Sequence, residues 1–138
     1  MTEVFDQWRL DVPWLPPSLN RYMRMHWRDR SRLLNEAGVA LKPYLRVVLT
    51  DLHTQGPLPW KAEMTFEVYA KKIRDDDNCV VARKVILDAM RKLGFLRNDD
   101  PSCVWSVDLP CRVDAAKPRT VITIKRYEDD ATCASVER

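Results

Sequence analysis

One segment of the chain, Trp60–Lys72, alternates between apolar and polar residues as far as Lys71. An alternation with a period of two predicts a β-strand with one buried face. The apolar positions of that face are Ala62, Met64, Phe66, Val68 and Ala70. Weaker alternations predict further strands at 4–14, 102–113 and 120–127, with Pro110 interrupting the second of these. We therefore expect a sheet of four strands.

Two other segments space their apolar residues three and four apart, which is typical of amphipathic helices. The first runs from Ser31 to Leu52, where we expect Gly38 to weaken the helix and Pro43 to kink or divide it. The second begins at about Asn78 and ends at Gly94. Either Asn78 or Asp77 would be a suitable N-cap for it. The apolar faces are Leu34, Ala37, Leu41, Leu45 and Val48 in the first helix, and Val81, Ala82, Val85, Ile86, Ala89, Met90 and Leu93 in the second.

The order of these elements is β-α-β-α-β-β. It predicts an α+β or α/β fold, a small mixed β-sheet with two packed helices. A chain of 138 residues is one domain of ordinary size, so we expect a single domain over 1–138. We expect loops at 18–32 and 55–59 and mobile tails at 1–6 and 128–138.

Composition narrows the setting of the protein. No apolar run approaches the roughly 18 residues that cross a bilayer, and the first residues lack a basic-then-apolar signal pattern. We therefore expect a soluble, cytoplasmic protein with no membrane partner. The cysteines show no C-x-x-C spacing, which favours reduced thiols over a zinc site or a disulfide framework. They are Cys79, Cys103, Cys111 and Cys133.

Aspartates gather at both ends of the second predicted helix, at 75–77 before it and at 99–100 after it. If 75–77 is extended, Asp75 and Asp77 face the same side, and the short loop after Gly94 would let the chain return close to the start of the helix. Two carboxylates about 4 Å apart repel by roughly 4 kcal/mol at an effective dielectric constant of about 20. A cation would offset that repulsion, and clustered carboxylate oxygens suit Mg²⁺ or Mn²⁺.

A plainer interpretation explains the same residues. Aspartates at a helix start are common as caps and partners of the helix dipole. The sequence N-D-D-P-S at 98–102 is an ordinary turn, and Lys84 and Asp88 would make a surface pair on the polar stripe that also holds Arg91. The residues alone leave both interpretations open.

The net charge of +3 is too small to indicate a nucleic-acid partner, but the distribution of the charge is more informative. The expected loop at 18–32 carries five arginines among aromatic residues, with only Asp29 opposing them. Guanidinium groups interleaved with aromatics suit phosphate contact and stacking on unpaired bases. The alternative is a solvated loop whose aromatics pack on the core. The candidate nucleic-acid residues are Arg21, Arg24, Trp27, Arg28, Arg30 and Arg32.

Several motifs occur in one characteristic order. They are W-L-P-P-S-L-N-R-Y at 14–22, D-x-D-N at 75–78, K-x-x-x-D-A at 84–89 and an acidic pair at 99–100. This order resembles the RusA family of Holliday junction resolvases, and the similarity touches residues from about 8 to 125.

The resemblance implies an endodeoxyribonuclease that resolves Holliday junctions or related branched DNA as a homodimer. It also implies metal binding by Asp75, Asp77 and Asp100, with Mg²⁺ as the cofactor and Mn²⁺ as a possible substitute. Lys84 would be required for cleavage, and Asp88 and Asp99 would support the metal site.

The chain departs from the family pattern at the lysine. The family's lysine lies three residues after the asparagine, where this chain has Val81, whereas Lys84 lies six residues after Asn78. Lys84 keeps the family's four-residue spacing to Asp88. The shift motivates an alternative, a protein of the same fold that binds branched DNA with impaired cleavage or none.

Overall fold

The computed structural model describes residues 4–72 and 77–127, and side chains within 6–72 and 79–127. The helices are α1 (Leu19–Arg24), α2 (Trp27–Asp51) and α3 (Asp77–Lys92). The strands are β1 (Val4–Val12), β2 (Ala62–Ala70), β3 (Val104–Asp108), β4 (Arg112–Val113) and β5 (Arg119–Tyr127).

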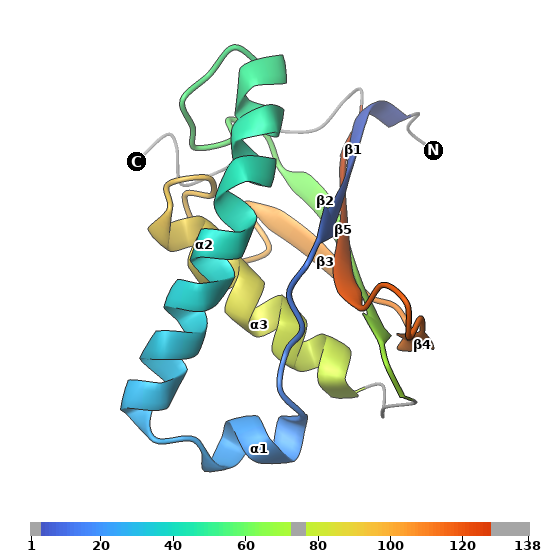
Figure 1. The fold of residues 1–138 in the computed structure, drawn as a ribbon. Coiled ribbons are helices and arrows are strands. Elements are labelled where there is room, and N and C mark those ends of the chain that lie inside the picture. Colours follow the sequence, from blue (N-terminus) through green and yellow to red (C-terminus); the bar gives the residue numbers. More distant parts are fainter. Residues whose placement is uncertain (1–3, 73–76, 128–138) are drawn as a thin grey trace.

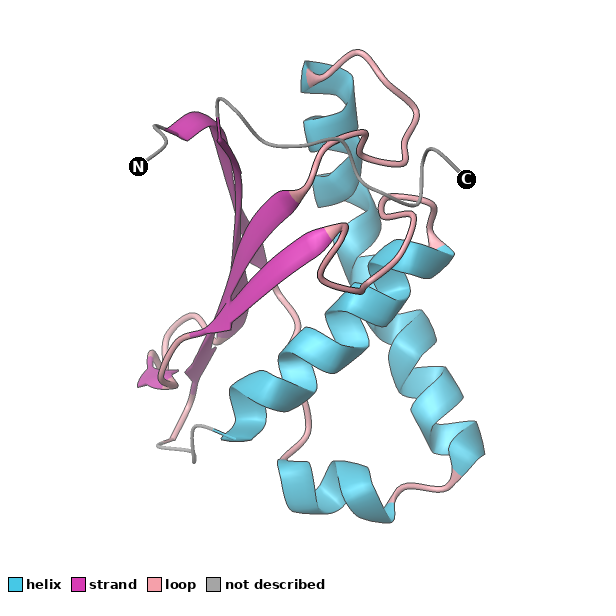
Figure 2. Cartoon of the chain, turned by 180° about the vertical axis from the view of Figure 1, so that it is seen from behind, coloured by secondary structure: helices cyan, strands magenta, loops and turns pink. Residues whose placement is uncertain are grey.

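The strands form one mixed sheet in the order β1-β5-β2-β3, and β4 pairs with the end of β2. Strand β5 runs antiparallel to both β1 and β2, while β3 and β4 run parallel to β2. Helices α2 and α3 lie together on one face of this sheet, so the molecule has two layers (Figures 1 and 2). The predicted α+β class with a small mixed sheet is therefore confirmed, with a third helix and a short fifth strand added.

The core lies between the sheet and the two long helices. Strand β2 buries every second residue against the helices, as its alternation predicts. Phe66 from this strand, Leu41 from α2, Ile86 from α3 and Ile122 from β5 are all essentially inaccessible to solvent. The side chains of α2 and α3 that meet them are those at helical spacing, although Leu93 at the end of the predicted face is 42% exposed.

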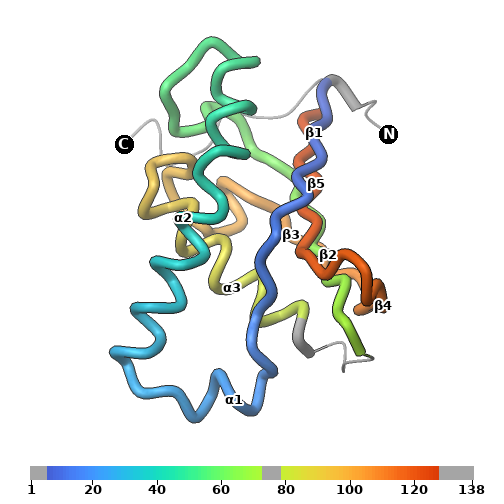
Figure 3. Tube along the Cα trace, in the orientation of Figure 1, coloured from blue at the N-terminus to red at the C-terminus, as the bar shows by residue number. Residues whose placement is uncertain are grey.

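The unit that orients the candidate site is β2-α3-β3. Because β3 is parallel to β2 and is its direct neighbour, α3 must carry the chain back along the sheet between them. Helix α3 therefore begins near the end of β2 and finishes near the start of β3, as the chain trace shows (Figure 3). Gly94 follows the helix with φ of 78°, the left-handed conformation expected just beyond a helix end.

The expected loop at 18–32 is wrong, because helix α1 and the first turns of α2 occupy it. Two side chains cap these helices. Ser18 Oγ accepts a hydrogen bond from the Arg21 N–H, and His26 Nδ1 accepts one from the Arg28 N–H. The caps satisfy backbone donors that would otherwise lack partners, so two short polar segments become helical.

Pro43 was expected to kink or divide the first predicted helix. The division is wrong, since α2 is a single helix that contains this proline. Pro43 cannot donate to the carbonyl of Val39. Both residues are exposed, so that carbonyl can bond to water instead. The predicted tail over 1–6 is wrong for residues 4–6, which belong to β1, and the tail over 128–138 lies outside the described residues.

No helix within the described ranges is long and apolar enough to cross a membrane.

Candidate functional site

The two predicted groups of aspartates lie at opposite ends of α3 within one chain. Asp77 is the first residue of the helix, and Asp100 follows its end and precedes β3. A helix of 16 residues is about 24 Å long. The expected return of the chain to the start of the helix is therefore wrong within a single chain. A helix that connects two parallel neighbouring strands begins beside the carboxyl end of the first strand and finishes beside the amino end of the second.

Asp75 lies outside the described residues, and so does the side chain of Asp77. Among the side chains that are described, no three or more from His, Cys, Asp and Glu gather in a way that would hold a metal ion.

Asp100 is held in a tight turn by the residues around it. Its Oδ1 accepts hydrogen bonds from the Ser102 N–H at 2.9 Å and from the Ser102 hydroxyl, and its Oδ2 accepts one from the Asn98 amide at 2.8 Å. Ser102 hydrogen bonds lower the pKa of Asp100 below its ordinary value, the hydroxyl contributing most. Each carboxylate oxygen keeps acceptor capacity, so Asp100 is an ionised, oriented group that fits the ligand chemistry of Mg²⁺.

The remaining acidic and basic candidates lie on or near α3. Asp99 is exposed, and its N–H donates to Asn98 Oδ1. Asp88 pairs with Arg91 at 2.9 Å rather than with Lys84, and Lys84 is exposed. Positions 77, 84, 88 and 91 share one stripe of α3, because seven residues make almost two full turns. Lys84 is thus about 10 Å along the axis from the start of the helix.

Two side-chain contacts fasten the start of α3 to the end of β3 and to the β3–β4 connection. Arg83 Nε donates to both carboxylate oxygens of Asp108, at 3.0 and 3.1 Å. The Sγ atoms of Cys79 and Cys111 lie 3.4 Å apart. Burial, together with the contact to Cys111, raises the pKa of the Cys79 thiol to about 12.

The cysteine prediction is correct for one pair and wrong for another residue. Cys79 and Cys111 are not in disulfides, as expected. Cys103 is disulfide-bonded, so the expectation of reduced thiols is wrong at this position.

An exposed basic surface lies where α1 meets α2, and Trp27 is 66% exposed within it. The Arg28 guanidinium lies 5.3 Å from the centre of the Trp27 ring, so a cation and an aromatic face are presented together. Helix α1 packs against α3, and it lies beside the end at which α3 begins (Figures 1 and 2). We call this exposed set the basic corner; it consists of Arg21, Arg24, Trp27, Arg28 and Arg32.

Arg30 does not belong to that exposed set. Its guanidinium donates to the backbone carbonyls of Tyr22 and Met23 at 3.0 and 3.3 Å, and it lies 4.5 Å from the centre of the Tyr22 ring. Arg30 thus closes the carbonyl end of α1 and fixes the angle between α1 and α2. The structure gives it a role within the fold, in contrast to the DNA contact predicted for it.

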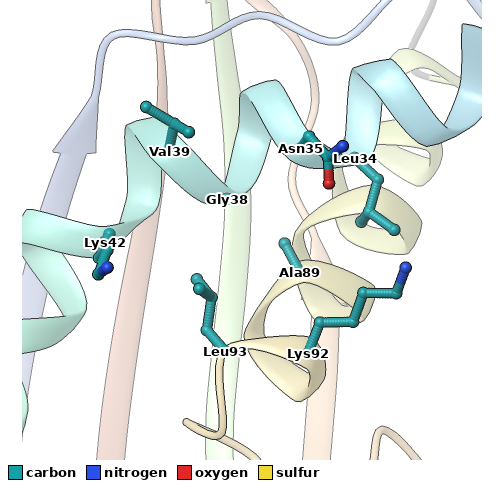
Figure 4. A pocket seen from close by; sticks show the side chains of 8 residues that line it. All are labelled: Leu34, Asn35, Gly38, Val39, Lys42, Ala89, Lys92 and Leu93. Atoms are coloured by element: carbon teal, nitrogen blue, oxygen red, sulfur yellow. The ribbon is translucent and has the colours of Figure 1, made fainter.

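A groove of about 290 Å³ runs between α2 and α3. Figure 4 shows Leu34 and Val39 of α2, Ala89 of α3 and Leu93 just after α3 around it, with a lysine from each helix, Lys42 and Lys92. The groove is mostly apolar and contains none of the predicted site residues. It does not form the predicted acidic site.

Two contacts were not predicted from the sequence: the ion pair between Arg83 and Asp108, and the contact between Cys79 and Cys111. The members of each pair are 25 and 32 residues apart in the chain. Arg83 looks like any polar residue of an amphipathic helix, and no spacing rule links it to Asp108. Only the pairing of β3 with β2 brings these side chains together.

Neither a scan against known family models nor a search of curated proteins found a match for this chain.

Proposed function

We propose that this protein is a Mg²⁺-dependent endodeoxyribonuclease that cuts branched DNA such as four-way junctions. The main supporting observation is that α1, which carries Arg21 and Arg24 of the basic corner, packs against α3 and lies beside the end of α3 that begins at Asp77. A surface that attracts phosphates next to a carboxylate-rich segment is what a metal-dependent nuclease requires. The motif order at 75–100 supports the same function.

Asp75, Asp77 and Asp100 would hold the cation. When bound, Mg²⁺ would polarise the scissile phosphate, help to generate hydroxide from water and stabilise the leaving 3′ oxygen. Asp100 suits a ligand role because its hydrogen bonds fix its orientation and keep it ionised. Lys84 would neutralise negative charge that builds on the phosphate in the transition state.

A complete site requires two copies of the chain. The helix start and Asp100 are separated by the length of α3, so they do not combine within one chain. A two-fold axis perpendicular to α3 would place the start of one helix beside the end of its mate, and would do so twice. We therefore propose a homodimer with two composite sites, each pairing Asp75 and Asp77 of one copy with Asp100 of the other.

The basic corner would hold the DNA backbone without reading base sequence. Its four arginines are exposed, and Trp27 presents a ring for stacking on bases that are unpaired at a branch point. Binding should therefore weaken steeply as salt rises. A DNA substrate agrees with the cytoplasmic location expected from the sequence.

A second candidate function is binding of branched DNA without cleavage. Two observations favour it: Lys84 lies two helical turns from Asp77, and Asp100 lies at the far end of the helix. The first would keep the lysine away from a phosphate bound at the start of the helix, and the second keeps the carboxylates of one chain apart.

The discriminating experiment uses a labelled four-way junction with Mg²⁺ or Mn²⁺, and compares the native protein with Asp77→Asn. Asp11→Asn is the matched control, because Asp11 is an exposed aspartate on β1, in a different part of the fold. We expect nicking by the native protein and the control, and a loss of at least about 100-fold in Asp77→Asn. Tight binding with no nicking in either metal would select the second function. Absence of both binding and nicking would reject both.

A further inference from the structure

We propose that Cys79 and Cys111 form an oxidation site, where peroxide joins the two thiols in a disulfide that fastens the start of α3 to the β3–β4 connection. The two sulfurs are 3.4 Å apart, and neither is in a disulfide. A disulfide bond is about 2.05 Å long, so the sulfurs need to approach by only about 1.4 Å.

The backbone on both sides of Cys111 is anchored to β2. The Leu109 N–H donates to the Phe66 carbonyl at 2.9 Å, and Arg112 pairs with Tyr69 in the parallel β4–β2 ladder. Cys111 therefore cannot drift away from the sheet without breaking one of these contacts.

Cys79 is anchored from the helix side. It lies in the first turn of α3, and Arg83, one turn later, holds the carboxylate of Asp108 at the end of β3. The Arg83–Asp108 contact thus holds the start of α3 close to the end of β3, next to the connection that carries Cys111. Two sulfurs held this way have a high effective concentration, and this proximity offsets the low intrinsic reactivity of the buried, protonated Cys79 thiol.

The exposure of the two thiols sets the order of the steps. Cys111 is half-buried and Cys79 is fully buried, so a small oxidant reaches Cys111 first. The Cys111 sulfur attacks hydrogen peroxide, the O–O bond breaks, and a sulfenic acid and one water form. The Cys79 sulfur then attacks the sulfenic sulfur, the S–S bond forms, and the second water leaves. In total, two thiols and one peroxide give one disulfide and two waters.

The bridge would restrict the unfolded chain, because it closes the loop from 79 to 111. It would form whether or not the protein cuts DNA. Its expected effect on the folded protein is a rise of roughly 5–10 °C in the melting temperature.

The test treats the full chain with hydrogen peroxide and locates the bridge by mass spectrometry under non-reducing conditions. Trypsin leaves Cys103 and Cys111 together on the segment 98–112, so a second cleavage at Asp108 is needed to separate them. We expect a linked pair of peptides that carry Cys79 and Cys111, a loss of two hydrogens from the intact mass, and reversal by dithiothreitol.

Cys111→Ala and Cys79→Ala are the matched variants. Cys111→Ala should remove both the linked peptides and the peroxide-dependent rise in melting temperature. Cys79→Ala should leave Cys111 as sulfenic or sulfinic acid with no bridge. The proposal is overturned if the native protein gives an oxidised Cys111 without a link to Cys79, or if the melting temperature rises equally in Cys111→Ala.

Discussion

The two ends of α3 are built in different ways. At the end of the helix, the backbone after α3 contacts the backbone of the loop before β2. The Leu58 N–H donates to the Phe95 carbonyl at 2.9 Å, and a Cβ added to Gly56 would lie 2.6 Å from the Gly94 oxygen. At the start, side chains make the contacts, through the Arg83–Asp108 ion pair and the paired thiols.

The two ends of α3 therefore differ in what they offer: the end of the helix anchors the fold, and the start lies near exposed charged groups. The end of the helix is held by close backbone contacts, and Asp100 follows it in a turn where Ser102 fixes the orientation of its carboxylate. The start of the helix lies beside α1, whose Arg21 and Arg24 are exposed to solvent. An acidic metal site can therefore be built in one of two ways. It uses the carboxylates at one end of α3 alone, or it joins the start of α3 from one copy of the chain to the end of α3 from another.

The largest predicted effect comes from mixing two inactive variants, Asp77→Asn and Asp100→Asn. If the site joins unlike ends across a dimer, a mixed dimer contains one intact site and one doubly altered site. Half of the dimers in an equal, equilibrated mixture are mixed, so nicking of a labelled junction should recover to about a quarter of the native rate.

The control for this prediction is each variant mixed with an equal amount of itself, which should stay inactive. A site confined to one chain gives a different result, because no chain in the mixture would then carry both aspartates. Failure of the mixture to recover any nicking, with dimers demonstrated by sedimentation, would contradict the two-copy arrangement.

The next largest effect is on stability at the end of α3. Gly56→Ala should lower the free energy of unfolding by roughly 2–4 kcal/mol, because Gly56 has φ of 92° and its new Cβ would collide with the Gly94 carbonyl. Gly94→Ala is the matched control, since it shares a positive φ but has nothing within 4 Å of an added Cβ. It should cost only about 1 kcal/mol. Urea unfolding of both variants measures the difference, and equal losses would contradict the close packing.

A smaller effect should appear at the basic corner. Arg28→Ala should weaken binding to junction DNA by roughly threefold to tenfold, and should lower the slope of log affinity against log salt by about one. Arg30→Ala should instead reduce stability, because its guanidinium closes α1, and should leave the salt slope unchanged. Fluorescence anisotropy at several salt concentrations, with thermal unfolding in parallel, distinguishes the two. The assignment fails if Arg30→Ala changes the salt slope as Arg28→Ala does.

The smallest effect is the dependence of stability on acid. Hydrogen bonds from Ser102 lower the pKa of Asp100 in the folded state below the unfolded value near 3.8. Asp100 therefore contributes stability above that unfolded value, and the contribution is lost as pH falls through the folded pKa. Ser102→Ala should be less stable than the native protein at pH 6, and the two unfolding curves should converge towards pH 2. Parallel curves over that range would show that Ser102 does not perturb the carboxylate.

The fold was largely predictable because its main elements have local signals. The alternation at β2 and the helical spacing in α3 each reflect one face buried against the core, and Gly94 ended its helix as expected. The segment before α2 was misassigned because its signals are weak: a serine and a histidine cap are needed to make α1 and the first turns of α2 helical. Pro43 did not divide α2 because it lies on the exposed side of the helix, where water can bond to the carbonyl that it leaves without a donor.

The candidate site was less predictable. Sequence spacing indicated two acidic groups but gave the wrong expectation that they meet in one chain. It also treated Arg30 as one more surface cation, although a carbonyl eight residues away holds it. These errors have one cause, since side-chain distances depend on strand order and helix direction rather than on separation along the chain.

The sequence by itself determined the elements, the buried face of each one and the types of charged group available for chemistry, because these follow from local periodicity and composition. Only the tertiary structure decided that β3 lies parallel beside β2. That pairing sends α3 back along the sheet, puts its two acidic ends apart, and brings Cys79 to Cys111 and Arg83 to Asp108. Parallel pairing is a long-range contact, and no local pattern in the chain encodes which neighbour a strand will take.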